Sequence, residues 1–392
     1  MSVRTGLDRL AAGGFAELRG RRVGLLAHPA SVDRELRHVC DLMRDASVAV
    51  EALFGPEHGL LGTAQDMESV AEERADAPRV YSLYGADAAS LRPTAEMLDG
   101  LDVVVVDLQD VGARYYTYAA TLAYVMEAAA EAQVAVMVLD RPNPIGGRED
   151  DLEGPAIAPG FESFVSELPI AVRHGMTMAE LAVMIRGQRG LDVELELQLM
   201  EGWQRDLDVD DTGLPWVMPS PNMPTLDAAI VYPGQCLFEG TELSEGRGTT
   251  RPFELVGAPW IDGVAWAERV RSLELPGVVF RPTAFKPMFQ KHGGARCGGL
   301  QLHVTDRRRY RSVETATALL WAARQLDPQR FAWRERAYEF VADRLAIDLL
   351  FGSEAPRRCI DAGAPWPDVA ETLSSGLEAF REARRAWLRY PA

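Results

Sequence analysis

A carboxyl group and an imidazole stand side by side at Glu57 and His58, in a glycine-rich loop that follows an apolar run. The run, residues 48–54, predicts a buried strand, and Gly55-Pro56 ends it because proline cannot continue a regular strand. A carboxyl group held at the mouth of a strand suits general acid or base catalysis. We therefore take Glu57 as the principal candidate acid and His58 as the group that orients it or tunes its pKa. The alternative is a solvated loop.

A second dense stretch, residues 237–254, contains four glutamates and two arginines with glycines between them. The stretch has neither helical nor strand periodicity. A plain surface loop does not need so much opposite charge, so we expect the stretch to contribute to a site, with a salt-bridged linker as the alternative. Glu239 is our first choice for a second catalytic carboxylate, and Asp110 is our second choice.

Four predicted strands, residues 22–27, 48–54, 101–108 and 134–139, each end in a polar loop. Helical spacing follows several of them, which predicts an α/β domain with a doubly wound, mostly parallel sheet. Ligands bind outside the carboxyl ends of the strands in such sheets, so we expect one functional cleft there. Its candidate groups are His28, Ser31, Glu57, His58, Asp107, Gln109, Asp110, Arg114, Asp140, Arg141 and Asn143.

Beyond about residue 262 the pattern changes to that of a smaller α+β domain, so we divide the chain into domains 1–262 and 263–392. In the second domain we expect helices at 264–271, 312–325 and 369–389, and strands at 277–281 and 299–304. In the first we also expect strands at 81–84 and 193–200, and helices at 35–45 and 118–132. Thr177 and Glu180 form a capping box that predicts a further helix up to residue 189. Residues 216–224 read as one more strand end, which presents Asn222.

The composition and motifs argue against several classes of binding partner and cofactor. The net charge of −17 argues against nucleic acid or an anionic membrane surface. No apolar run reaches the ~20 residues of a membrane span, and the first ten residues do not resemble a signal peptide, so we expect a cytoplasmic protein. The four cysteines show neither zinc-site spacing nor a disulfide framework. Neither G-x-G-x-x-G after the first strand nor a P-loop is present, which argues against a nucleotide cofactor.

Several long motifs resemble the exo-β-N-acetylmuramidase (NamZ) family of peptidoglycan-sugar hydrolases, in order and over nearly the whole length. The resemblance implies a Rossmann-like catalytic domain, an auxiliary domain that closes a cleft, and no metal or organic cofactor. It also implies removal of β-1,4-linked N-acetylmuramic acid (MurNAc) from the non-reducing end of cell-wall fragments. The motifs are residues 54–59 (Phe-Gly-Pro-Glu-His-Gly), 107–118, 140–144 (Asp-Arg-Pro-Asn-Pro), 219–224, 239–250 and 387–390.

The implied substrate suggests roles for further residues. The lactyl carboxylate of MurNAc suits bidentate contact with an arginine, for which Arg114, Arg141, Arg247 and Arg251 are candidates. His28, Gln109, Asn143 and Asn222 are candidates for the acetamido and hydroxyl groups, and Tyr115 and Tyr116 for stacking on a sugar face. Two features depart from the family. Many members are exported, whereas the first ten residues of this chain do not resemble a signal peptide. Glu242 stands where Asn is expected in many relatives, which makes Glu242 a poor choice for an essential acid.

Three other functions stay open at this point. A non-catalytic two-domain protein could close on the sugar without cutting it. A metal-dependent hydrolase could use His28, Asp107, Asp110 and His174, although no H-x-H or H-E-x-x-H is present. A serine nucleophile is the weakest alternative because G-x-S-x-G is absent. The separation of the two carboxylates, and so retention or inversion, also stays open.

Overall fold

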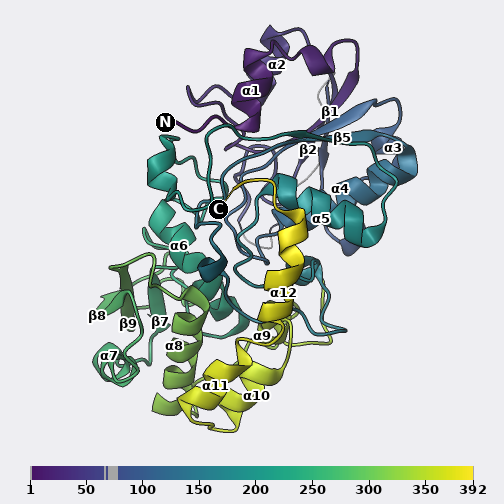
Figure 1. The fold of residues 1–392 in the computed structure, drawn as a ribbon. Helices are drawn as coiled ribbons and strands as arrows, with labels where there is room; N and C mark the ends of the chain where they lie inside the picture. Colours follow the sequence, from purple (N-terminus) through teal and green to yellow (C-terminus); the bar gives the residue numbers. More distant parts are fainter. Residues whose placement is uncertain (1, 66–67, 69–77, 392) are drawn as a thin grey trace.

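Six parallel strands form the central sheet, in the order β3-β2-β1-β4-β5-β6 (Figure 1). The structure is a computed structural model and describes residues 2–65, 68 and 78–391. The strands are β1 (Arg22–Ala27), β2 (Ala49–Gly55), β3 (Arg79–Ser82), β4 (Val103–Asp107), β5 (Ala135–Leu139) and β6 (Leu195–Gln198). This is the strand order of a doubly wound Rossmann-like domain, and it reverses between β1 and β4. The α/β fold class predicted from the sequence is confirmed.

Both faces of the sheet are covered, as the unbroken apolar runs predicted. Val104 and Val106 face a core that includes residues of α4 (Tyr118–Ala132) and α5 (Met178–Arg189). Val103 and Val105 face the opposite core, with residues of α1 (Gly6–Ala12) and α2 (Val39–Asp45). Successive side chains of a strand point to opposite faces, so β4 is buried throughout.

The second sheet is antiparallel, with the order β7-β9-β8. Its strands are β7 (Leu255–Ala258), β8 (Val278–Phe285) and β9 (Cys297–Val304), so β7 lies before residue 262, where we placed the domain boundary. That boundary remains a prediction. The other helices are α3 (Ala95–Leu98), α6 (Leu226–Gln235), α7 (Gly263–Arg271), α8 (Ser312–Leu326), α9 (Ala346–Phe351), α10 (Ala355–Asp361), α11 (Trp366–Thr372) and α12 (Leu377–Arg384).

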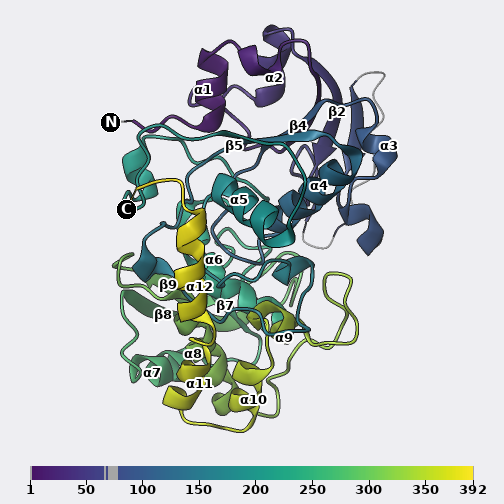
Figure 2. The same ribbon diagram turned by 45° about the vertical axis from the view of Figure 1, so that its right-hand side comes forward.

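The C-terminal segment returns to the first domain. Figure 2 shows α12 running from the lower lobe back toward the central sheet. Tyr390 then donates a hydrogen bond to the buried carboxylate of Asp140, directly after β5. The ring of Tyr390 also packs edge-on against Trp203 at 4.9 Å. The chain end therefore helps to close the first domain.

Three local predictions were wrong. The helix expected at 35–45 begins only at Val39, because Asp33 holds residues 33–37 in a turn through backbone N–H groups. The helix expected at 369–389 is broken by Gly376, whose φ of 72° is left-handed. Residues 216–224 form a loop without a strand.

Within the described residues no helix is both long and apolar enough to cross a bilayer.

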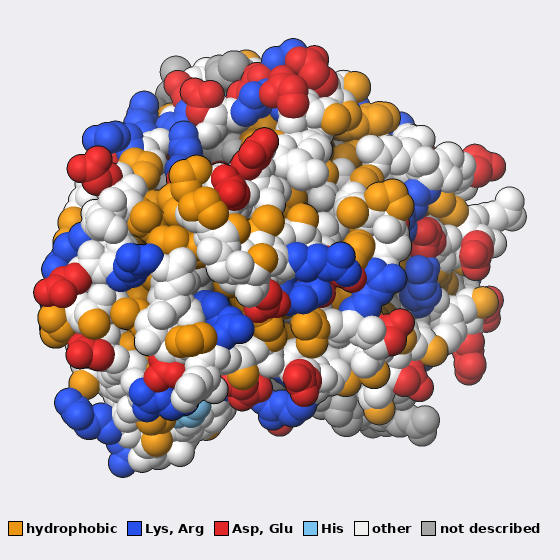
Figure 3. Space-filling view, turned by 90° about the horizontal axis from the view of Figure 1, so that it is seen from below, with side chains coloured by type: hydrophobic (Ala, Val, Ile, Leu, Met, Phe, Trp, Pro, Cys, Tyr) orange, Lys and Arg blue, Asp and Glu red, His pale blue; other side chains and the backbone are white. Residues whose placement is uncertain are grey.

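The surface of the smaller lobe carries charges of both signs. Figure 3 views the molecule from below, and basic and acidic side chains are interspersed over this face. Partly or fully exposed ion pairs on the protein surface include Arg381 with Glu378 at 2.7 Å. Exposed pairs contribute little to stability. They do, however, prevent a large single-sign field on this face.

Candidate active site

Glu57 lies where β2 gives way to a tight turn. Gly55 permits this turn, because a Cβ there would lie 2.6 Å from the backbone nitrogen of Leu60. The amide of Gly59 donates to the carbonyl of Pro56 at 2.8 Å, and His58 adopts a left-handed φ of 71°. A non-glycine residue in this region is strained, and such strain is concentrated at functional sites. The turn buries both Glu57 and His58.

The carboxyl group of Glu57 has two polar neighbours. Thr117, at the start of α4, donates a hydrogen bond from Oγ1 to Oε2 at 2.5 Å. The Nε2 of His58 lies 3.6 Å from Oε1. The Nδ1 of His58 lies 2.9 Å from the carbonyl oxygen of Ala64, which can only accept, so Nδ1 carries a hydrogen. Nε2 therefore faces Glu57, and a proton can pass between the two groups.

Glu239 occupies a different environment in the same pocket. It is almost fully buried, and it accepts hydrogen bonds from Arg247 at 2.6 Å and from Tyr338 at 2.7 Å. Burial alone would raise the pKa of Glu239, but the charge of Arg247 and the two hydrogen bonds hold that pKa below its ordinary value. Gly240 permits close packing here, because a Cβ would meet the backbone of Ile347 at 2.7 Å. Glu239 is thus held ionised.

Glu57 and Glu239 line one cavity, which we call the Glu57 pocket. It encloses about 30 Å³ and is lined also by His58, Thr117, Arg247, Glu339 and ten further residues. Such a volume holds one or two water molecules, so its lining must separate before a sugar enters. Aromatic side chains make up much of the wall: Tyr116 packs edge-on against Tyr118 and Tyr232. A buried pair of carboxyl groups beside aromatic rings is suited to acid-base chemistry on a ring substrate such as a sugar.

Four of the predicted binding residues, Tyr115, Tyr116, Asn222 and Arg247, line the Glu57 pocket. Arg247 lies between two carboxylates, at 2.6 Å from Glu239 and 3.6 Å from Glu245. Asn222 donates to the side chain of Gln65 at 2.8 Å. Tyr115 donates its hydroxyl hydrogen to the carbonyl of Pro233. Tyr115 and Tyr116 are both buried.

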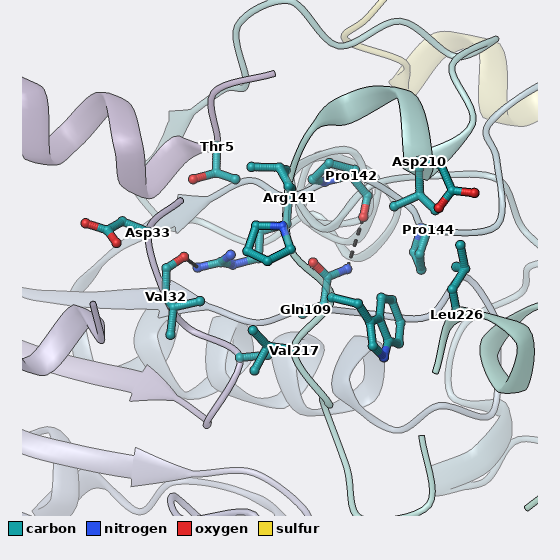
Figure 4. Close-up of a pocket in the computed structure, with 15 residues that line it drawn as sticks. Thr5, Val32, Asp33, Gln109, Arg141, Pro142, Pro144, Asp210, Val217 and Leu226 are labelled. Carbon is teal, nitrogen blue, oxygen red and sulfur yellow. Dashed lines mark hydrogen bonds between the residues drawn. The ribbon is translucent and has the colours of Figure 1, made fainter. Parts of the chain in front are cut away.

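Two other predicted residues lie in a second cavity, of about 120 Å³, outside the ends of β1, β4 and β5 (Figure 4). Arg141 makes a bidentate ion pair with Asp107, at 2.6 and 2.8 Å. Figure 4 shows the side-chain amide of Gln109 directed at the carbonyl of Pro142, 3.1 Å away. This cavity is larger than the Glu57 pocket, but its charged groups are already paired, as Asp33 is with Arg37. The chemistry therefore points to the smaller pocket.

His28 lies beneath the second cavity and is fully buried. Its Nε2 accepts from the backbone N–H of Gln109 at 2.9 Å, and its Nδ1 faces the carbonyl of Pro219 at 3.3 Å. Burial, together with the charge of Arg141, lowers the pKa of His28 to about 3, so the ring is neutral. Both ring nitrogens are occupied. In the part of the chain that the structure describes, no three His, Cys, Asp or Glu residues are placed to hold a metal ion.

The remaining predicted residues lie outside the Glu57 pocket and make other contacts. Arg114 donates to the carbonyls of Pro155, Ile170 and Leu350 at 2.7–2.9 Å. Asp110 accepts from the amide of Gly112 at 2.6 Å and lies 3.4 Å from His174. Asn143 donates to the carbonyl of Met176, and Arg251 pairs with Glu254.

Two pocket residues, Tyr338 and Glu339, were not singled out from the sequence. They lie on a turn of the C-terminal domain, and both are buried. Their surrounding segment contains no glycine-rich or strand-end pattern. The one available signal was an aromatic and an acidic residue side by side, which is too common to select a site.

Comparison with known proteins identifies the family. The model described as "Exo-beta-N-acetylmuramidase NamZ, N-terminal" matches residues 23–227, and its C-terminal counterpart matches 230–390. The "Peptidoglycan beta-N-acetylmuramidase NamZ" of Bacillus subtilis (strain 168) is 42% identical over 392 residues, which cover 99% of this chain and 91% of that protein.

Two solved structures have the same fold. Both are DUF1343 family proteins of Bacteroides fragilis NCTC 9343. One is 34% identical with a TM-score of 0.87 and covers 99% of each chain. The other is 26% identical with a TM-score of 0.75 and covers 100% of this chain and 99% of that one. With family models matched to residues 23–227 and 230–390, and with a relative 42% identical over 99% of its length, this chain belongs to the exo-β-N-acetylmuramidase NamZ family.

Proposed function

We propose that this protein is a glycosidase that releases β-1,4-linked MurNAc from the non-reducing end of peptidoglycan fragments. The observation that carries the proposal is the pair of Glu57 and Glu239, two buried carboxyl groups in one pocket with unlike surroundings. Glycoside hydrolysis needs such a pair, one group to protonate the leaving oxygen and one ionised. Membership of the family supports the reaction and the sugar.

Glu57 is the proton donor in this proposal. Thr117 fixes Oε2, which leaves Oε1 beside His58 as the oxygen that carries the proton. As the glycosidic bond breaks, the proton passes from Glu57 to the leaving sugar oxygen. Water adds to the anomeric carbon, and the proton that this water loses returns to Glu57 through His58, whose Nε2 lies 3.6 Å from Oε1.

Glu239 supplies the negative charge. The transition state of glycoside hydrolysis resembles an oxocarbenium ion, so an ionised carboxylate nearby lowers its energy. Arg247 and Tyr338 keep Glu239 ionised and fix both of its oxygens. Arg247 is also the one predicted arginine that lines the pocket among the described residues, so we assign it the lactyl carboxylate of the substrate.

The proposal is tested by measuring free MurNAc released from a MurNAc-β-1,4-GlcNAc disaccharide. Glu57→Gln removes the transferable proton and keeps the shape, so kcat should fall by at least about 10³-fold. Glu239→Gln should reduce kcat by about 10²-fold or more. The matched control is Glu242→Gln, because Glu242 is in the same stretch as Glu239 but is 45% exposed, and it should retain the wild-type rate.

Other outcomes identify other functions. Wild-type rates in a folded Glu57→Gln protein would refute the role of Glu57 and move the donor to another carboxyl group. Binding of the disaccharide without turnover would replace the enzyme by a sugar-binding protein. Activity that disappears on thorough chelation and returns with added metal would favour the metal-dependent hydrolase.

We also propose that the protein acts in the cytoplasm, on wall fragments that are being recycled. Among the described residues, Cys40, Cys297 and Cys359 form no disulfide, as is usual in a reducing compartment. The net charge of −17 supports a small sugar substrate over nucleic acid. Cell fractionation with an antibody checks the compartment, and recovery of the native protein mainly outside the cell would refute it.

A further inference from the structure

A strained turn closes the Glu57 pocket from the side of the C-terminal domain. The backbone amides of Tyr338 and Val341 each donate to the carbonyl of the other at 2.9 Å. The two residues between them, Glu339 and Phe340, have positive φ values of 46° and 67°. Turns of this kind favour Asn-Gly at the two central positions, because other residues are strained there. A Glu-Phe pair in this turn is held by its contacts, and strain of this kind points to a functional role.

The contacts of the turn span both domains. Tyr338 donates its hydroxyl hydrogen to Glu239 at 2.7 Å. Glu339 accepts from the hydroxyl of Tyr84, which follows β3, at 3.0 Å. The ring of Phe340 meets that of Tyr84 at 5.8 Å. The segment leading into α9 carries this turn (Figure 2), so a buried carboxyl group of this segment lines the pocket.

A buried carboxylate in the wall of the pocket suits the recognition of a free hydroxyl group. An ionised carboxylate only accepts hydrogen bonds, and a sugar hydroxyl donates one. The terminal residue of a glycan has a free 4-hydroxyl, whereas in an internal residue the same oxygen is glycosidic, has no hydrogen and carries the next sugar. An internal residue would leave Glu339 buried without a donor from the substrate and would push the chain into the turn.

We propose that Glu339 accepts a hydrogen bond from the free 4-hydroxyl of the terminal MurNAc, and that the turn of residues 338–341 thereby restricts cleavage to the chain end. This inference rests on the proposed function. Tyr338 links the turn to Glu239 through its hydrogen bond. Glu339, which accepts the terminal hydroxyl, is therefore held in place relative to the ionised Glu239. Tyr84 is the partner of Glu339 when the sugar is absent.

The test compares 4-nitrophenyl β-N-acetylmuraminide with its 4-deoxy analogue. Wild type should lose roughly 10- to 100-fold in kcat/KM on the analogue, the effect of one charge-assisted hydrogen bond. Glu339→Gln should lose a similar factor on the parent substrate. The kcat/KM of this variant should differ by less than about threefold between the parent substrate and the 4-deoxy analogue, because the two changes remove the same contact. Glu335→Gln, an exposed neighbour on the same segment, should discriminate like wild type.

A second variant guards against a disturbed turn. Glu339→Asn with Phe340→Gly removes the carboxylate and favours the same turn, so it should fold and show the same loss of discrimination. Full discrimination in both folded variants would overturn the assignment of Glu339, and so would a wild type that accepts both substrates equally. Failure of wild type to release nitrophenol from either substrate would instead count against the proposed function.

Discussion

Asp140 shows how strongly a single buried residue can couple this fold to pH. It lies directly after β5 and is fully buried. It accepts hydrogen bonds from the hydroxyl of Thr177 at 2.8 Å, from the amide of Ala179 at 2.9 Å, and from Tyr390. These bonds favour the ionised form, but burial outweighs them and raises the pKa of Asp140 to about 7.

Stability should therefore decline between about pH 4 and pH 7. In the unfolded chain Asp140 loses its proton near pH 3.9, whereas in the folded chain it keeps the proton until about pH 7. The folded state binds more protons in this window, so the free energy of unfolding falls as pH rises, by roughly 4 kcal/mol at most. Urea unfolding of wild type and Asp140→Asn measures this, because the variant does not titrate.

The stability of wild type relative to Asp140→Asn should decrease through this window and become constant above it. Asp150→Asn is the control, because Asp150 is exposed and its replacement should leave the wild-type slope unchanged. A constant difference between wild type and Asp140→Asn from pH 4 to pH 8 would contradict the assignment.

The sequence was informative for some site residues and not for others. Glu57 and Glu239 were accessible because each lies in a loop with unusual glycine and charge content, and the structure brings both into one pocket. Of the four candidate arginines, Arg247 alone lines that pocket within the described part of the chain. A long guanidinium side chain can turn to carboxylates or to backbone carbonyls, and its partners are set by tertiary packing. Glu339 was missed because its place in the pocket is likewise set by tertiary packing.

At the scale of elements, strong local signals succeeded. The bounds of β1 and α4 agree with prediction to the residue. An unbroken apolar run is typical of a buried strand, and an alanine-rich stretch is typical of a helix. The capping box of Thr177 and Glu180 is present at the start of α5. Errors occurred where one residue overrides a periodic pattern, as Gly376 does between α11 and α12. Local periodicity does not report such breaks.

Across the whole molecule, Arg114 joins the two domains. Its guanidinium donates to the carbonyls of Pro155 and Ile170 in the N-terminal domain and to that of Leu350 in α9. Burial lowers the pKa of Arg114 to about 10, which still leaves it charged at neutral pH. One buried cation thus satisfies three backbone oxygens that would otherwise lack these donors.

Replacing Arg114 by Met should destabilise the fold without altering substrate binding directly. Loss of the donor to three buried carbonyls should lower the free energy of unfolding by about 3 kcal/mol or more. Chemical denaturation and KM for MurNAc-GlcNAc are measured together. Wild-type stability with a raised KM would instead assign the lactyl carboxylate to Arg114, one of the four arginines that the sequence offered for it.

The Glu57 pocket draws its residues from both ends of the chain, from Glu57 after β2 to Glu339 just before α9. The site therefore does not exist on the ribosome until nearly all of the protein has been made and both domains have met. A nascent chain, or either half left by a proteolytic cut between them, lacks one of the paired carboxyl groups or the turn that covers them. We therefore expect glycosidase activity only where all of these parts are present.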